Sequence, residues 1–198
     1  MDKVVLAFSG SLRKESFSMK LVKAFGEEAP SDVDFRVADI SKLPVYNQDH
    51  ELPEPDFLLE LKAQLRPAHG VLFVTPEYNR SIPPLLKNAL DWASRPQTLP
   101  GTGPWAGKVA AIAGISSYPL GAVSAVFHLR QVLTFLNMPT MQQPEFYLSL
   151  AADKFDEQGK LIDQVTKDHI NSFWETFAPF VERFAKTPAE TPVEQYAR

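Results

Sequence analysis

Three short, continuous apolar runs constrain the fold of this chain more than any other feature of its sequence. They lie within residues 4–8, 70–75 and 108–114, and a polar or turn-forming stretch follows each of them. A run of this length with apolar residues at successive positions is typical of a strand that is buried on both faces of a parallel sheet. Residues 33–39 alternate instead with period two, so we expect a further strand there, at an edge of the sheet.

Segments with helical spacing of apolar residues separate these runs. We predict helices over residues 19–29, 57–66, 84–92, 123–136 and 162–184, and a less regular last strand over residues 138–148. Pro83 and Pro84 preset the first turn of the third helix, and Pro179 is expected to kink the last one. Strands and helices that alternate along a chain favour an α/β domain with a parallel sheet.

The length of 198 residues suits one doubly wound domain, which we assign to residues 1–186. Residues 187–198 contain several proline and charged residues and are predicted to form a flexible tail.

Residues 41–56 contain several prolines and are too irregular for a helix or strand. A loop of this length in a compact domain is expected to be functional or packed against another element.

The composition excludes several classes of function. The net charge of −4 gives no broad basic surface for nucleic acid. The chain has no cysteine, so it has no disulfide, iron–sulfur cluster, thiolate metal site or cysteine nucleophile. The four histidines lack a paired spacing with carboxylates, and we expect no metal site. No apolar run approaches the ~20 residues of a membrane span and no secretory leader is visible, so a cytoplasmic location is expected.

Three turns that follow buried strands have unusual compositions, at residues 9–18, 76–82 and 116–121. In an open sheet of order 2-1-3-4-5, ligands bind beyond the carboxyl ends of the strands, where the strand order reverses. The first turn combines several serines with Arg13 and opens a helix, which is a suitable arrangement for a phosphate. Taken alone, this turn fits an ordinary serine-capped connection equally well. A ligand with a phosphate at one end and a planar ring at the other would bridge the three turns.

The residues of these turns also form longer motifs. They read Gly-Ser-Leu-Arg-Lys-Glu-Ser-Phe-Ser at 10–18, Thr-Pro-Glu-Tyr-Asn-Arg-Ser-Ile-Pro-Pro at 75–84 and Leu-Lys-Asn-Ala-Leu-Asp-Trp at 86–92. Together they resemble the NADPH-dependent FMN reductase family, whose flavodoxin-like members include quinone, azo-dye and chromate reductases. Leu-Pro-Val-Tyr-Asn-Gln-Asp at 43–49 and His-Leu-Arg-Gln at 128–131 extend the resemblance over nearly the whole chain.

The resemblance implies a flavodoxin-like three-layer sandwich with FMN as cofactor and NADPH or NADH as co-substrate. It implies that the FMN phosphate is held by Ser11, Arg13, Ser16 and Ser18, with a backbone contact from Phe17. It implies that Pro76, Glu77, Tyr78 and Asn79 run along the isoalloxazine ring, and that Ser116 and Ser117 approach from the third side. Ser9, Ser81 and Ile82 complete the expected cofactor site. The 116–121 turn departs from the glycine-richer version that is common in the family.

The resemblance also implies that the flavin itself carries the chemistry, so that no catalytic side chain is required. Hydride would pass from nicotinamide to the flavin and then to a quinone, azo dye, chromate or free flavin. The chain offers no second nucleotide domain, which favours a ping-pong scheme. Glu77 is assigned a positional role, as a carboxylate that accepts backbone N–H groups. In the family, helices such as that at 123–136 pack into homodimers, which often pair into homotetramers.

Two other classes of function remain open at this stage. A flavodoxin-type electron carrier would bind FMN without oxidising nicotinamide, and a noncatalytic flavin-binding protein would only sense the cofactor. Carriers usually have a markedly acidic surface, whereas this chain has Arg13 and Lys14 in the phosphate turn and a net charge of only −4. These features favour the enzyme.

Overall fold

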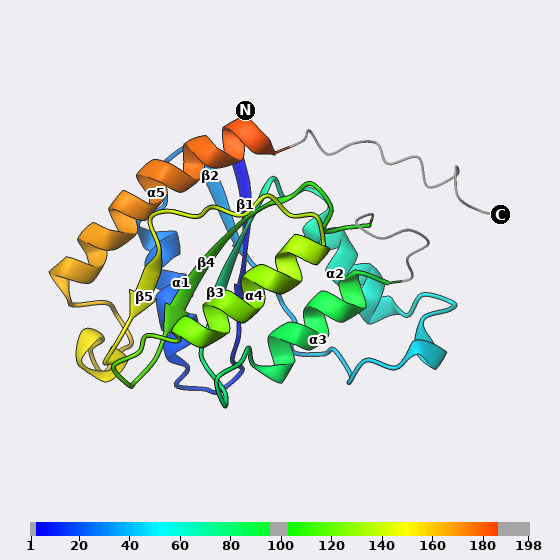
Figure 1. The fold of residues 1–198 in the computed structure, drawn as a ribbon, viewed down its shortest axis with the longest axis horizontal. Coiled ribbons are helices and arrows are strands. Elements are labelled where there is room, and N and C mark those ends of the chain that lie inside the picture. Colours follow the sequence, from blue (N-terminus) through cyan, green and yellow to red (C-terminus); the bar gives the residue numbers. More distant parts are fainter. Residues whose placement is uncertain (1–2, 96–102, 186–198) are drawn as a thin grey trace.

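A parallel sheet of five strands runs through the middle of the molecule, in the order β2-β1-β3-β4-β5 (Figure 1). The computed structural model describes residues 3–95 and 103–185. The strands are β1 Lys3–Ser9, β2 Val33–Val37, β3 Gly70–Thr75, β4 Val109–Ile115 and β5 Phe146–Leu148. The strand order and the parallel pairing confirm the sheet predicted from the sequence, with β2 at one edge.

Helices cover both faces of this sheet. They are α1 Phe17–Glu27, α2 Asp56–Leu65, α3 Pro84–Ala93, α4 Val123–Phe135 and α5 Gln164–Phe184, and short 3-10 turns lie at Gln48–His50 and Ala151–Lys154. The helices α1 and α5 pack on one face, and α2, α3 and α4 pack on the other (Figure 1). The flavodoxin-like three-layer arrangement is therefore confirmed.

The side chains of β1 explain why the apolar runs are continuous. Val5 and Ala7 belong to the core under α1 and α5, whereas Leu6 and Phe8 belong to the core on the opposite face. Successive side chains of a strand point to opposite faces, so a strand covered on both sides needs apolar residues at every position. The core also contains the buried aromatic residues Trp92, Phe173, Trp174 and Phe177, and the partly buried Phe180 packs against it.

The last strand is shorter than the sequence predicted. Of residues 138–148, only Phe146–Leu148 pairs with β4 in a ladder, and Thr140 forms one isolated bridge. Pro139 and Pro144 lack the N–H group that a ladder requires, which limits regular pairing in this segment.

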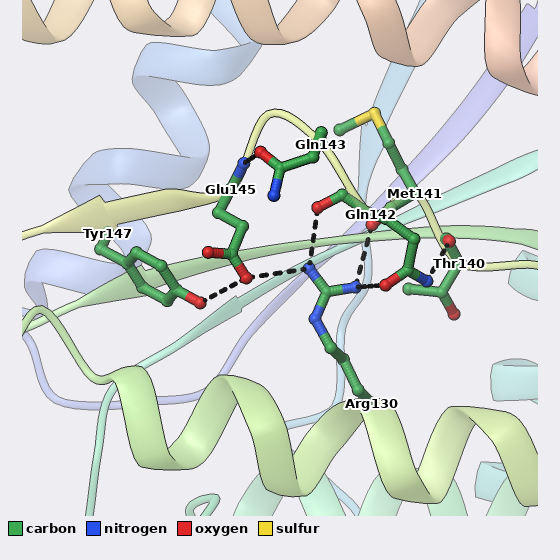
Figure 2. A network of polar contacts seen from close by, with 7 residues as sticks. All are labelled: Arg130, Thr140, Met141, Gln142, Gln143, Glu145 and Tyr147. Carbon is green, nitrogen blue, oxygen red and sulfur yellow. Dashed lines mark hydrogen bonds and ion pairs between the residues drawn. The ribbon is translucent and has the colours of Figure 1, made fainter.

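A side chain of α4 holds the segment before β5 in place (Figure 2). Arg130 donates hydrogen bonds to the carbonyl oxygens of Met141 and Gln142, at 3.0 and 3.5 Å, and pairs with Glu145 at 3.9 Å. The same carboxylate accepts a 2.9 Å hydrogen bond from the Tyr147 hydroxyl. Burial, together with this carboxylate, raises the pKa of Tyr147 to about 12. Arg130 thus binds the backbone between the isolated bridge at Thr140 and the start of β5.

The last helix begins two residues later than the predicted boundary at 162. Asp163 caps it, because its carboxylate accepts a 2.9 Å hydrogen bond from the Thr166 N–H. Ile162 lies before the cap and donates its N–H to the carbonyl of Lys154 at 2.9 Å. The helix then continues through Pro179.

Residues 41–56 are packed against α3, as a long loop in a compact domain requires. The Trp92 indole and the Asn88 amide both donate to the carbonyl oxygen of Pro44, each at 2.8 Å. Asn88 in turn accepts the Tyr46 N–H at 2.8 Å, and the Tyr46 ring packs edge-on against Trp92. These contacts give a structural reason for the motifs at 43–49 and 86–92.

Within residues 3–95 and 103–185, no helix has the length and apolar character needed to cross a membrane. Residues 187–198, predicted as a flexible tail, lie outside the described residues.

Candidate functional site

The turns after β1, β3 and β4 meet in one cavity of about 350 Å³ at the carboxyl ends of these strands. The first turn lines it with Ser11, Arg13, Ser16, Phe17 and Ser18, the second with Pro76, Glu77 and Tyr78, and the third with Ile115, Ser116, Ser117 and Tyr118. The chain passes from β1 to β2 on one side of the sheet and from β3 to β4 on the other, so the strand order reverses between β1 and β3. The cavity therefore lies where ligands bind in open α/β sheets.

The turn after β1 forms a cradle suited to an anion. Ser16 caps α1, and its hydroxyl oxygen accepts a 3.3 Å hydrogen bond from the Met19 N–H. The preceding N–H groups of Phe17 and Ser18 have no acceptor within the helix. The Ser11 hydroxyl oxygen accepts the Arg13 N–H at 3.3 Å. Hydroxyls, helix N-terminal amides and a guanidinium together are the donor set that a phosphate monoester needs, so the cradle fits the phosphate of FMN.

Arg13 is held near this cradle without being buried. Its guanidinium donates to the carbonyl oxygen of Glu15 at 2.7 Å and lies 5.7 Å from the centre of the Phe17 ring. An exposed arginine with one backbone partner keeps several N–H donors for a ligand, since the guanidinium carries five.

Gly10 brings the first turn into contact with the second. Its N–H donates to the carbonyl oxygen of Val74 at 2.9 Å. A β-carbon at this position would lie 2.5 Å from Cδ of Pro76 and 2.9 Å from Cγ of Pro83. These distances leave no room for a side chain, so glycine permits the two walls of the cavity to approach.

Glu77 links the second turn to α4. One of its carboxylate oxygens accepts the N–H groups of Ser124 and Ala125, at 2.9 and 3.2 Å. The residue that precedes this helix, Ala122, offers no side-chain acceptor and has a positive φ of 67°. A carboxylate at a helix N-terminus satisfies its N–H groups and complements the macrodipole. Glu77 thus has the geometry of the positional role expected for it.

The rest of the second turn supports the wall of the cavity without lining it. Asn79 and Arg80 both have positive φ, and Tyr78 and Ser81 exchange two backbone hydrogen bonds of 3.0 Å around them. Two central residues with positive φ are typical of a type I′ turn. The Ser81 hydroxyl lies 2.9 Å from Nδ1 of His128 on α4.

Two further residues of the predicted site lie beside the cavity. Ile82 packs against the core on the α2, α3 and α4 face. The Ser9 hydroxyl is buried, accepts the Ser11 N–H at 3.4 Å and donates to the Ser11 carbonyl at 3.1 Å. Ser9, Asn79, Ser81 and Ile82 are therefore near the cavity but outside its lining.

The end of β4 and the third turn contribute two lining residues that sequence reasoning missed, Ile115 and Tyr118. The Ser116 hydroxyl oxygen accepts the Tyr118 N–H at 3.0 Å, and the Ser116 N–H donates to Leu148 at 2.9 Å. Only one feature of the sequence pointed to Tyr118 as a lining residue: it is an aromatic residue in the turn that follows a buried strand.

Comparison with known proteins agrees with the fold. A family model of NADPH-dependent FMN reductases matches residues 4–153. A 2-hydroxy-1,4-benzoquinone reductase from a Burkholderia species is 42% identical over 172 residues, which are 87% of this chain and 92% of that protein. A quinone reductase from Pseudomonas putida is 43% identical over 174 residues, covering 87% of this chain and 91% of the relative.

One solved structure is similar to this chain over nearly the whole length of the chain. It is FerB, described as a flavoenzyme NAD(P)H:(acceptor) oxidoreductase from Paracoccus denitrificans, with a TM-score of 0.85 and 35% identity. The match covers 93% of this chain and 100% of FerB. The resemblance read from the motifs is thus confirmed, and the chain belongs to the NADPH-dependent FMN reductase family.

Proposed function

We propose that this chain is an FMN-dependent oxidoreductase that takes hydride from NADPH or NADH and passes it to a quinone. The observation that carries this proposal is the single cavity that joins an anion cradle after β1 to the turns after β3 and β4. Family membership supplies the cofactor class, because the family is that of NADPH-dependent FMN reductases. The names of the relatives, quinone reductase and 2-hydroxy-1,4-benzoquinone reductase, favour a quinone as acceptor.

In this proposal the first turn binds the phosphate of FMN. Ser11, Ser16 and Ser18 donate from their hydroxyls, Phe17 donates from its backbone, and Arg13 supplies the positive charge. Charge-assisted hydrogen bonds of this kind contribute about 1.5–3 kcal/mol each. The turn therefore retains the cofactor and takes no part in hydride transfer.

The other two turns hold the ring of the cofactor. Pro76, Glu77 and Tyr78 form one side, and Ser116 and Ser117 approach from the other. Bound FMN supplies the hydride chemistry, and the protein supplies orientation and limits the access of water. Because one cavity serves both substrates, the nicotinamide leaves before the acceptor enters, in a ping-pong scheme. Azo dyes, chromate and free flavin are further acceptors to be tested.

Anaerobic titration of the purified protein with NADPH tests the proposal. We expect a yellow protein, or one that turns yellow with added FMN, whose visible absorbance bleaches rapidly with NADPH and returns when a quinone is added. An electron carrier or a noncatalytic flavin protein would bind FMN but would not bleach rapidly. A colourless protein that binds no added FMN would contradict the proposal at its first step.

We also propose that the protein works as a homodimer or homotetramer through α4. This helix exposes two aromatic side chains, Phe127 and Phe135, which are 58% and 68% accessible in the single chain.

We further propose a cytoplasmic location, because a chain without cysteine suits a reducing compartment.

A further inference from the structure

The side chain of Tyr118 lines the cavity but has little contact with the rest of the chain. It is 77% exposed, although it lies in the turn that follows a fully buried strand. Tyr78, on the turn after β3, lines the same cavity and is 47% exposed. Single exposed apolar residues are common on protein surfaces, but two exposed aromatic rings on different walls of one cavity are suited to covering a ligand.

The backbone that carries Tyr118 is firmly held. Its N–H donates to the Ser116 hydroxyl oxygen at 3.0 Å, and the next carbonyl, of Pro119, accepts the Ser149 hydroxyl at 2.6 Å. Gly121 then takes a positive φ of 58° and lies against Tyr147. A tyrosine on a fixed backbone has only two side-chain torsions to order, so a contact with a ligand costs little conformational entropy.

Charge and position indicate what this ring can bind. The cationic and hydroxyl donors that suit a phosphate lie on the first turn, whereas Tyr118 lies on the third turn beside Ser116 and Ser117. Its flat, uncharged face suits an offset stack with another planar ring rather than an anion.

We propose that Tyr118, with Tyr78 on the opposing turn, forms an aromatic wall that selects planar aromatic electron acceptors over acceptors without a ring. The inference rests on the proposed function and adds to it the residue that determines acceptor preference. Tyr118 acts by binding the acceptor and has no role in holding FMN.

The test uses the FMN-loaded protein and the variants Tyr118→Ala and Tyr118→Phe. Each protein is first reduced with NADPH and then mixed in a stopped-flow instrument with 1,4-naphthoquinone or with ferricyanide, which has no aromatic ring. For Tyr118→Ala we expect the second-order rate constant with naphthoquinone to fall by about 3- to 10-fold, the range that a lost aromatic stack corresponds to. The rate with ferricyanide and the dissociation constant of FMN stay unchanged, and Tyr118→Phe retains the wild-type rates.

Each other result overturns the inference. An unchanged naphthoquinone rate in Tyr118→Ala means that the ring does not contact the acceptor. An equal loss with both acceptors means that Tyr118 acts through the cofactor, and a loss in Tyr118→Phe assigns the effect to the hydroxyl. Failure of the proposed function is distinguishable from all of these, because the wild-type protein would then not bind FMN or would not be reduced by NADPH.

Discussion

Arg13 is the residue that best separates cofactor retention from fold stability. Its side chain is exposed and its partners are the Glu15 carbonyl and the Phe17 ring, so the core does not depend on it. We expect Arg13→Ala to raise the dissociation constant of FMN by about 10- to 100-fold, which corresponds to one lost charge-assisted contact. Fluorescence titration of FMN into the flavin-free protein measures this change.

Arg13→Lys serves as the matched control for charge. Lysine keeps the positive charge but loses the fork of donors, so an intermediate dissociation constant is expected. The melting temperature of the flavin-free protein should be the same in all three forms. If Arg13→Ala bound FMN as tightly as the wild type, the phosphate assignment of the first turn would have to be abandoned.

Glu77 is predicted to affect the stability of α4 rather than hydride transfer. Removal of an N-cap acceptor costs ~1 kcal/mol, so Glu77→Ala should lower the free energy of unfolding by about this amount. Glu77→Gln keeps an oxygen that can accept the Ser124 and Ala125 N–H groups and should recover most of the loss. Urea unfolding of the flavin-free proteins compares the three forms, and equal losses in both variants would exclude the capping role.

These residues also mark the limit of what the sequence can predict about the site. The cradle at 9–18 could be read locally, because a serine cap and a helix N-terminus are neighbours in the chain. Glu77 accepts the Ser124 N–H although the two residues are 47 positions apart in the sequence, and only the folded sheet brings them together. Tyr118 was missed because an exposed aromatic residue has no periodic pattern to identify it.

At the scale of elements, local burial decided which predictions succeeded. The runs at 4–8, 70–75 and 108–114 correspond to β1, β3 and β4, because a strand covered on both faces is apolar throughout. The last strand could not be predicted in the same way. Prolines interrupt its segment, and the contact that holds the Met141 carbonyl comes from Arg130, on another element.

The start of α5 gives a prediction about pH. Hydrogen bonds from Thr166 and the ammonium of Lys154 hold the pKa of Asp163 at about 2, below its ordinary value of 3.8. A carboxyl whose pKa is lower in the folded state stabilises the fold above its unfolded pKa, and this contribution disappears as the pH falls. We therefore expect Asp163→Ala to be less stable than the wild type by ~1 kcal/mol at pH 6.

That difference should shrink as the pH falls from about 4 towards 2, because protonation removes the same interactions from the wild type. Urea unfolding at several pH values measures it. Asp163→Asn is the control, since asparagine keeps the capping oxygen but cannot titrate. A difference between wild type and Asp163→Ala that stayed constant down to pH 2 would contradict the assignment.

At the scale of the whole molecule, the outer face of α4 is the surface on which assembly can be tested. Phe127 and Phe135 are eight positions apart and lie on the same side of the helix. Stable dimers typically bury about 1,200–2,000 Å² in total, and exposed aromatic residues are enriched at the centre of such interfaces. We expect the wild type to sediment as a dimer or tetramer at micromolar concentration.

The variant with both Phe127→Asp and Phe135→Asp should sediment as a monomer. The free energy needed to bury two unpaired carboxylates exceeds the free energy that the contact contributes to association. Phe184→Asp is the matched control, since Phe184 is also an exposed aromatic residue but lies at the far end of α5. It should leave the mass of the assembly unchanged. A wild type that sediments as a monomer would contradict the proposed assembly. A double variant that kept the mass of the assembly would mean that the subunits meet through a different face.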